Sequence, residues 1–413
     1  MNALTRRRFL LASGVAAVAA SAATVGWKDL ADRTRSDPLP AGTGVLVLVT
    51  LYGGNDGLNT VVPAADPAYQ SARPDLAYAQ SEVLDIGEGL GLNPGLAGLK
   101  QQWDNGTLAI VRGVSYPKPD HSHFRSMDIW QTASPDHPAG TGWIGRWLDA
   151  NGRDPLTAVS LEPVLPPMLA GATTAGAALP LRGLALPTGP LATAFTALGQ
   201  PSAGESALQA YAARSITDLH RTVDTFGKDV NKDVDKDVDA TPAAGKAKGN
   251  KRAGALAAQL DVVARCVEAG APARVYSVSL GGFDTHADER GTQQRLLTEV
   301  DQAVSGFLTR MAGTERGRGV VVMAYSEFGR RVAANANEGT DHGTAGPVFV
   351  AGAPVRGGFV GEQPSLTDLD QGDLKATTDF RDVYATMLSD VLNADPAPVL
   401  GPGRTTLPLL AGA

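Results

Sequence analysis

Cysteine is almost absent from this chain, which has one, Cys266, among 413 residues. A single thiol excludes an intramolecular disulfide and any zinc site built from cysteines. Cys266 lies in a stretch with helical periodicity, where the ordinary role of cysteine is that of a small buried apolar side chain. Since 43% of the residues are hydrophobic, the chain can bury a large core without a covalent link.

Positive charge is also in short supply. The chain has 36 Lys and Arg residues against 43 Asp and Glu residues, which gives a formal net charge of -7. A nucleic-acid-binding protein carries a broad basic surface. We therefore expect no nucleic acid among the partners of this protein.

Long apolar runs are missing as well. The best candidate, residues 9–26, is short for a membrane span and rich in Ala, Gly and Ser. It directly follows TRRRFL at residues 5–10, which matches the twin-arginine export pattern, and small residues suited to cleavage lie at 21–23. We predict a signal peptide at 1–26, the twin-arginine export machinery as a partner, no stable membrane span in the mature chain, and a periplasmic or extracellular location.

Strand and helix patterns alternate along the rest of the chain. Segments rich in Val, Ile and Leu predict strands covered on both faces, at 44–52, 107–114, 273–280, 319–326 and 346–353. Helical periodicity is found at 123–133, 205–226, 252–270, 291–311 and 379–393. This alternation predicts an α/β protein with a mainly parallel sheet.

Two stretches break the alternation. Residues 155–201 are rich in Pro, Gly, Ala and Leu, and we interpret them as an irregular cap segment. Residues 228–252 carry alternating Lys and Asp with no large apolar side chains beyond valine. We predict that this charged insertion is flexible and solvated, because it cannot bury enough apolar surface to offset its ordering entropy.

Acidic and imidazole side chains recur in glycine-rich turns next to the predicted strands. Each turn alone is typical of an ordinary turn. Open parallel sheets, however, place their ligand-binding residues just beyond the carboxyl ends of the strands, and the placement repeats here four times. The residues in these turns are Asp56, Asp284, His286, Glu327, Asp341 and His342.

Carboxylate oxygens and imidazole nitrogens in one cleft suit a divalent metal, Zn²⁺ or Mn²⁺, as one or two ions and without an organic cofactor. Two adjacent ions suit attack on a phosphoryl or similar ester. Ser122, in YPKPDHSHFRSMDIWQ, is a candidate hydroxyl nucleophile at a helix N-terminus, flanked by His121 and His123. The alternative for Ser122 is a simple helix N-cap.

Six short motifs occur in order: GGNDGLN, SHFRSMDIWQ, GWIGRWLDA, GGFDTH, SEFGRR and GTDHG. From about Val45 to the C-terminus, the chain resembles an exported bacterial family, domain of unknown function 1501. That family is grouped with the alkaline-phosphatase and sulfatase-like superfamily. The resemblance implies one domain over 40–413, a three-layer α/β/α sandwich around a large mainly parallel sheet, and a bimetal site at the strand ends.

The resemblance also implies roles for individual residues. Asp56 resembles the first-strand aspartate ligand, Ser122 lies in the nucleophile region, and Asp284 with His286 resembles an aspartate–histidine ligand pair. Glu327 stands where an Asp-His pair is usual. His342 resembles the last histidine ligand.

Two departures from the superfamily pattern reduce the expected ligand set. The aspartate–histidine pair is spaced Asp-x-His here instead of Asp-x-x-x-His. The strand-end Asp-His is replaced by Ser-Glu, so one histidine ligand is missing unless Asp341 and His342 take its role. One ion, two ions and no ion stay open as alternatives.

Three functions are consistent with these patterns. The first, which we favour, is a metal-dependent hydrolase or transferase acting on a small-molecule phosphate or sulfate ester. The second is a metal-free serine esterase, since GGND and FDTH are similar to GDSL-type blocks, although no GDS stretch precedes Gly53. The third is an exported non-catalytic binding or assembly protein. Arg330 and Arg331, near the expected site, are predicted to be surface charges.

Overall fold

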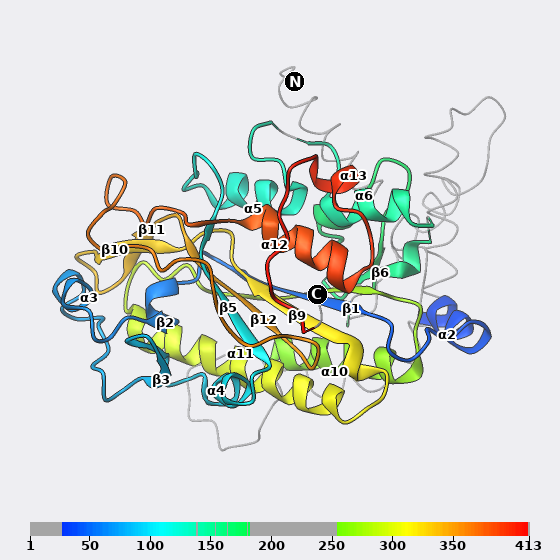
Figure 1. The fold of residues 1–413 in the computed structure, drawn as a ribbon, viewed down its shortest axis with the longest axis horizontal. Helices are drawn as coiled ribbons and strands as arrows, with labels where there is room; N and C mark the ends of the chain where they lie inside the picture. Colours follow the sequence, from blue (N-terminus) through cyan, green and yellow to red (C-terminus); the bar gives the residue numbers. More distant parts are fainter. Residues whose placement is uncertain are drawn as a thin grey trace, which may run out of the picture. The chain divides into compact units, whose positions relative to one another are not determined.

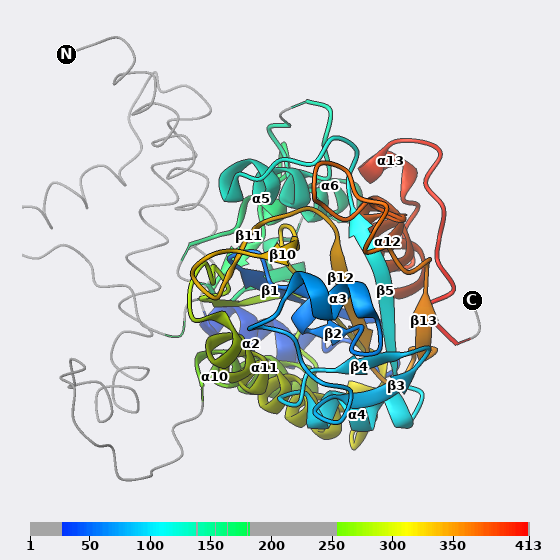
Figure 2. The same ribbon diagram turned by 90° about the vertical axis from the view of Figure 1, so that its left-hand side faces the viewer.

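The structure is a computed structural model. It describes residues 27–137, 139–152, 154–162, 164–179, 181 and 254–411. Figures 1 and 2 show these residues as ribbons in two views. Three predicted segments lie outside the described residues: the signal peptide at 1–26, the helix at 205–226 and the charged insertion at 228–252.

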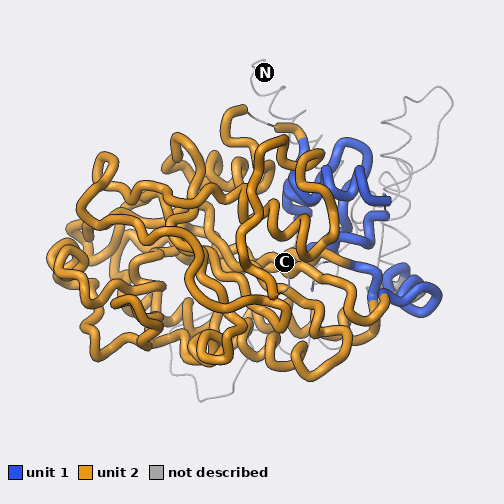
Figure 3. Tube along the Cα trace, viewed as in Figure 1, with its two compact units in different colours: residues 1–39, 141–252, 271–273 blue, residues 40–140, 253–270, 274–413 orange. Residues whose placement is uncertain are grey.

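The chain divides into two compact units (Figure 3). Unit 1 comprises residues 1–39, 141–252 and 271–273, and unit 2 comprises residues 40–140, 253–270 and 274–413. All the predicted site residues lie in unit 2. The expectation of a single domain over 40–413 stays a prediction.

The centre of unit 2 is a strand made almost entirely of Val and Leu. β1 (Val45–Tyr52) is buried from its first residue to Leu51. It pairs in parallel with β8 (Val275–Gly281) on one side and with β9 (Val320–Tyr325) on the other. Continuous apolar runs of this kind are expected where helices cover both faces of a sheet, so these three strand predictions are confirmed.

One strand of this sheet, β12 (Gly346–Ala351), runs against its neighbours. It is antiparallel to both of them, β9 and β5 (Leu108–Ser115). β13 (Gly358–Val360) and β14 (Thr378–Asp379) pair in parallel with β5, which gives the order β13-β5-β12-β9-β1-β8. The sheet is therefore mainly parallel, as predicted, and β12 begins at the edge where its neighbours end.

Helices cover both faces of this sheet (Figures 1 and 2). α4 (Ala97–Asp104), α10 (Ala255–Ala269) and α11 (Glu289–Ala312) lie on one face, with α11 packed against the other two. α5 (His123–Thr132) and α12 (Phe380–Thr386) lie on the other face. This is the expected three-layer α/β/α arrangement. α11 is the crossover that joins β8 to β9, as two parallel strands require.

The helices on the second face are held by aromatic packing. The ring of Trp130 in α5 stacks on Tyr325 in β9, with centroids 5.0 Å apart, and it also contacts Phe380 in α12 at 4.8 Å. The Tyr384 hydroxyl donates to the Trp130 carbonyl at 2.9 Å. Beyond α12 the chain makes a π-helical turn, Met387–Val391, and then α13 (Ala397–Leu400). These contacts fix α5, and with it the residues at its N-terminus.

Smaller elements surround the carboxyl edge of the sheet. After η1 (Gly57–Asn59), β2 (Val61–Val62) joins β4 (Leu90–Leu92) and β3 (Leu84–Gly87) in a three-stranded sheet, with α3 (Pro67–Ala72) between. At the opposite edge, η4 (Gly317–Gly319) directly precedes β9. β10 (Arg330–Ala334) and β11 (Thr340–His342) form an antiparallel pair that connects β9 to β12. Because antiparallel neighbours need no crossover helix, the chain stays at this edge throughout the connection.

The described part of unit 1 has less regular structure than unit 2. It contains α2 (Trp27–Ser36), α6 (Trp143–Ala150), η2 (Pro155–Thr157) and η3 (Pro167–Leu169). β6 (Ala158–Ser160) and β7 (Ala177–Ala178) pair in parallel. The carboxylate of Asp149 accepts from the backbone N–H groups of residues 172–174. The described part of the predicted cap segment is thus largely irregular. Among the described residues, no helix is long and apolar enough to span a membrane.

Candidate metal centre

Four chain segments meet at the carboxyl edge of the unit 2 sheet. β8 leads into the turn with Asp284 and His286, and β9 leads directly to Glu327. His342 ends β11 just before the reversed strand β12, so it reaches the same edge. The fourth segment is the start of α5, where His123 is the first helical residue.

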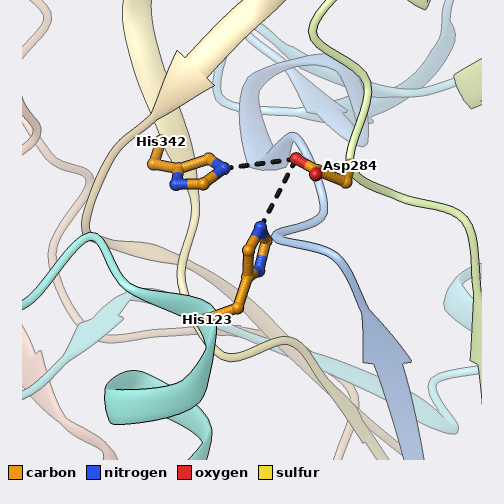
Figure 4. A group of neighbouring side chains, drawn as sticks. All are labelled: His123, Asp284 and His342. Atoms are coloured by element: carbon orange, nitrogen blue, oxygen red, sulfur yellow. Dashed lines mark hydrogen bonds and ion pairs between the residues drawn. The ribbon is translucent and has the colours of Figure 1, made fainter.

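Imidazole rings from three of these segments converge on one oxygen. Asp284 Oδ1 lies 3.0 Å from His286 Nε2, 3.2 Å from His342 Nε2 and 3.4 Å from His123 Nε2. Figure 4 shows His123, Asp284 and His342 pointing toward one another. One ligand atom from each of these three residues lies within 4.8 Å of the others. Of the predicted site residues, Asp284, His286 and His342 are thus brought together.

The tautomer of His342 is set by a backbone carbonyl. Its Nδ1 lies 2.7 Å from the carbonyl oxygen of His121, which can only accept, so Nδ1 carries a proton. Burial lowers the pKa of the His342 ring below its ordinary value of 6.5, so the ring is neutral at neutral pH. Its Nε2 therefore presents a lone pair toward Asp284.

The same arrangement recurs at His123. Its Nδ1 lies 2.8 Å from Oε1 of Glu327. Its Nε2 is buried and has no hydrogen-bond partner in the described part of the chain. When the neutral ring donates from Nδ1 to the carboxylate, Nε2 carries a second lone pair aimed at Asp284. A buried acceptor without a donor is costly unless another group satisfies it.

Asp284 is ionised in this setting. Burial raises the pKa of its carboxyl, but the hydrogen bond and the charge of Arg330 outweigh burial, and the pKa falls to about 2. Asp284 Oδ1 lies within 3.4 Å of each Nε2 atom, and an anion this close to two lone pairs is repelled by them, so a cation bound between the three residues would relieve the repulsion. The ligand atoms of a tetrahedral zinc ion are about 3.3 Å apart for bonds of about 2.0 Å. The three residues therefore fit a small divalent ion.

His286 is the most exposed of the three histidines in the cluster. Its Nε2 lies 2.9 Å from Nε2 of His342, and its Nδ1 lies 3.5 Å from Oδ1 of Asp341. Asn335 donates to the same Asp341 oxygen at 3.3 Å. His286 can serve as a fourth ligand, the third through nitrogen, when its proton is on Nδ1, toward Asp341. The structure thus places Asp341 behind a candidate ligand and not in the centre.

Arg330 is a buried residue and not the predicted surface charge. Its exposure is 1%, and its Nη2 donates to Asp284 Oδ1 at 2.7 Å. Other donors of the same guanidinium bind the carbonyls of Gly54 at 2.7 Å and Thr340 at 2.9 Å. One side chain therefore joins the turn after β1, the turn after β8 and β11. It also compensates the charge of Asp284.

Asp56 is placed differently from the sequence-based expectation. Its carboxylate forms a fully buried ion pair with Arg73, and its Oδ1 accepts from the Leu58 N–H at 3.1 Å. Burial raises the pKa of Asp56, but the charge of Arg73 outweighs burial and keeps the pKa below its ordinary value. The turn after β1 thus directs its aspartate into the protein, toward Arg73 at the end of α3, because a buried cation there needs a counterion.

Glu289, at the start of α11, is buried next to this ion pair. Burial and the negative charge of Asp56 raise the pKa of Glu289 to about 9, so it is protonated at neutral pH. Its Oε2 accepts a hydrogen bond from the Thr340 hydroxyl. A neutral carboxyl next to an ionised one avoids the repulsion of two buried anions.

We expect Glu289→Gln to raise the free energy of unfolding at alkaline pH. The ordinary pKa of a glutamate carboxyl is 4.5, whereas that of Glu289 in the folded chain is about 9, so unfolding releases a proton between these values. Stability therefore falls as pH rises through this window, by at most about 1.4 kcal/mol per pH unit. The neutral amide removes this loss. Urea unfolding between pH 6 and pH 9 measures it, and the exposed Glu315→Gln is the control. Parallel pH curves for the Glu289 variant and wild type would contradict a protonated Glu289.

Ser122 is the N-cap of α5. It is exposed, and its Oγ accepts from the Arg125 N–H at 3.5 Å. This matches the alternative given for Ser122 from the sequence. Its role as a nucleophile stays a prediction.

Sequence reasoning does not single out three residues that matter here. It identifies His123 only as a neighbour of Ser122, assigns Arg330 to the surface, and gives no role to Arg73. The available signal for His123 is its position directly after the N-cap of a helix that follows two prolines, since this fixes the helix start and brings the residue to the strand ends.

Comparison with known proteins supports the family resemblance. Residues 205–397 match the family model described as "Protein of unknown function (DUF1501)". The match includes GGFDTH, SEFGRR and GTDHG, whereas GGNDGLN, SHFRSMDIWQ and GWIGRWLDA precede it. The resemblance predicted from the motifs is confirmed over this range. No match to the chain is found among curated proteins.

Solved structures with similar folds include sulfatases. The structure of Ps i-CgsB in complex with k-i-k-neocarrahexaose is 10% identical, with a TM-score of 0.39, and the alignment covers 86% of this chain and 77% of that one. A putative sulfatase from Bacteroides thetaiotaomicron VPI-5482 is 10% identical, with a TM-score of 0.31 and coverage of 88% and 76%.

Proposed function

We propose that this protein is exported by the twin-arginine route to the periplasm or beyond. We further propose that it is a metal-dependent hydrolase or transferase of phosphate or sulfate esters. One observation carries the proposal: the Nε2 atoms of His123 and His342 converge on Oδ1 of Asp284 within 3.4 Å. Such a set of acceptors suits a cation, and nitrogen with carboxylate oxygen suits Zn²⁺ or Mn²⁺.

His123, Asp284 and His342 would hold the ion, with His286 available as a fourth ligand. When bound, such an ion polarises an ester oxygen and lowers the pKa of bound water. The Nδ1 atom of His123 is held by Glu327, and the Nδ1 atom of His342 is held by the His121 carbonyl. Outer partners of this kind fix the orientation of metal ligands.

One side of the cluster is packed against an aromatic ring, and the other side is exposed to solvent. Phe328 packs against the rings of His123 and His342, with centroids 4.8 and 4.9 Å apart. His286 is 44% exposed and Asp284 is 49% exposed. A substrate would therefore approach on the His286 side, while Phe328 excludes water behind the ligands.

The buried carboxylates favour one ion over two. Asp56 is neutralised by Arg73, and Oε1 of Glu327 accepts from the Gly53 N–H and faces His123 Nδ1. Neither carboxylate is free to serve a second ion without breaking these contacts. We therefore propose a single-ion centre.

Purified full-length chain should bind about one Zn²⁺ or Mn²⁺ per molecule by elemental analysis. It should hydrolyse some member of a panel of aryl phosphate and aryl sulfate esters. A chelator should abolish turnover and re-added metal should restore it, because the bound ion would polarise the ester oxygen and activate the water. Metal binding without turnover would favour the binding or assembly protein. Turnover of carboxyl esters without metal would favour the serine esterase.

A further inference from the structure

Glu327 occupies a sheltered position between two strand ends. It lies two residues after the end of β9, is 2% exposed, and faces the glycine turn that follows β1. Its Oε1 accepts from the Gly53 N–H at 2.9 Å and lies 2.8 Å from His123 Nδ1. The single hydroxyl proton of Ser326 has two acceptors within reach, the Leu51 carbonyl at 2.6 Å and Oε2 at 2.9 Å. The Gly53 N–H thus holds Oε1, the oxygen that faces His123 Nδ1.

The consequence for His123 concerns its tautomer. A carboxylate oxygen held by a backbone N–H presents an acceptor to Nδ1, so it favours the tautomer with the proton on Nδ1. The lone pair is then on Nε2, on the opposite side of the ring, which points at Asp284. The ring is also held from the side by Phe328, with centroids 4.8 Å apart.

We infer that Glu327 is a positioning residue and not a metal ligand: it selects the Nδ1–H tautomer of His123 and aims the Nε2 lone pair at the metal position. This inference rests on the proposed function for the metal itself, but the tautomer is a property of the chain alone. This positioning role replaces the role of direct metal ligand that the sequence suggested for Glu327.

The test begins with the wild-type protein without metal. Two-bond ¹H–¹⁵N spectra of protein labelled with ¹⁵N-histidine distinguish the two neutral tautomers, and His123→Gln identifies the His123 signal by its loss. We expect His123 to carry its proton on Nδ1. A spectrum with the proton on Nε2 would overturn the inference, and this measurement needs no altered Glu327.

The second step is Glu327→Gln, which keeps the size of the side chain and removes its charge. We expect a mixture of His123 tautomers and metal affinity 10- to 100-fold weaker, the usual loss for an outer partner of a ligand, with the stoichiometry unchanged. Competition with a chromophoric chelator measures the affinity. Asp301→Asn is the matched control, since Asp301 is another buried carboxylate, but it accepts from the Gly98 and Leu99 N–H groups.

The outcomes separate the inference from the proposed function. If Glu327→Gln abolishes binding as completely as Asp284→Asn, Glu327 is itself a ligand and the inference is wrong. Unchanged tautomer and affinity would also overturn it. If wild type binds no metal, the proposed function fails, and the shift of the His123 tautomer in Glu327→Gln still decides whether Glu327 positions the ring.

Discussion

Asp284→Asn should weaken metal binding by more than about 100-fold and abolish metal-dependent ester turnover. Loss of an outer partner already costs 10- to 100-fold, and Asp284 is the anionic member of the candidate group formed with His123 and His342. Its pKa of about 2 means that the charge is present at any working pH. Without it, a cation would face two neutral imidazoles and the nearby Arg330 guanidinium, which repels it.

Asp341→Asn is the matched control for this substitution. Asp341 lies in the same cluster, but its carboxylate is 61% exposed and stands 3.5 Å behind His286. We expect an affinity loss of no more than about 10-fold, at the lower limit for an outer partner. Metal titration and circular dichroism of each variant separate binding from folding. Full metal occupancy in Asp284→Asn would remove the basis of the proposed site.

Arg73→Met should destabilise the protein by about 3–5 kcal/mol. Arg73 and Asp56 are both fully buried, and removing one partner of such a pair leaves an uncompensated charge in the interior. The substitution also leaves the carbonyls of Val332 and Arg331 without the donors that reach them at 2.9 and 2.7 Å. Urea unfolding followed by tryptophan fluorescence measures the loss.

The double variant Asp56→Asn with Arg73→Met separates charge from packing. If the cost is that of an unpaired carboxylate, the double variant should be more stable than Arg73→Met alone, by several kcal/mol. Arg73→Lys keeps the charge and should therefore lower the free energy of unfolding by less than Arg73→Met does. It replaces Arg73→Met in the comparison if that variant does not fold. A loss below about 1 kcal/mol for Arg73→Met would mean that water reaches Asp56.

The sheet could be predicted because strands that are buried on both faces have apolar residues at every position. VLVLVTLY at β1 and VVVMAY at β9 are apolar throughout, and only strands covered on both faces tolerate that composition. Asp284, His286 and His342 could be predicted for a related reason. Polar side chains at strand ends lie at one edge, whatever the details of the turns.

The direction of individual side chains could not be predicted in the same way. Asp56 follows β1 just as Asp284 follows β8, yet it turns toward Arg73, which lies 17 residues away at the end of a different element. His123 reaches the site only because α5 docks on the sheet through Trp130. Both outcomes depend on tertiary packing, which leaves no periodic signal in the local sequence.

The short antiparallel ladder of β10 and β11, which leads into the reversed strand β12, sets the relative positions of two side chains in the candidate metal centre. In the β10–β11 pair, Arg330 stands directly opposite His342. Arg330, which compensates the charge of Asp284, and His342, which would bind the same metal ion as Asp284, are therefore cross-strand neighbours. Slippage by a single residue would turn either side chain to the opposite face of the ladder. Insertions in the connecting segment 335–339 should be tolerated only when they preserve this alignment, so the length of that turn is under tighter constraint than its composition.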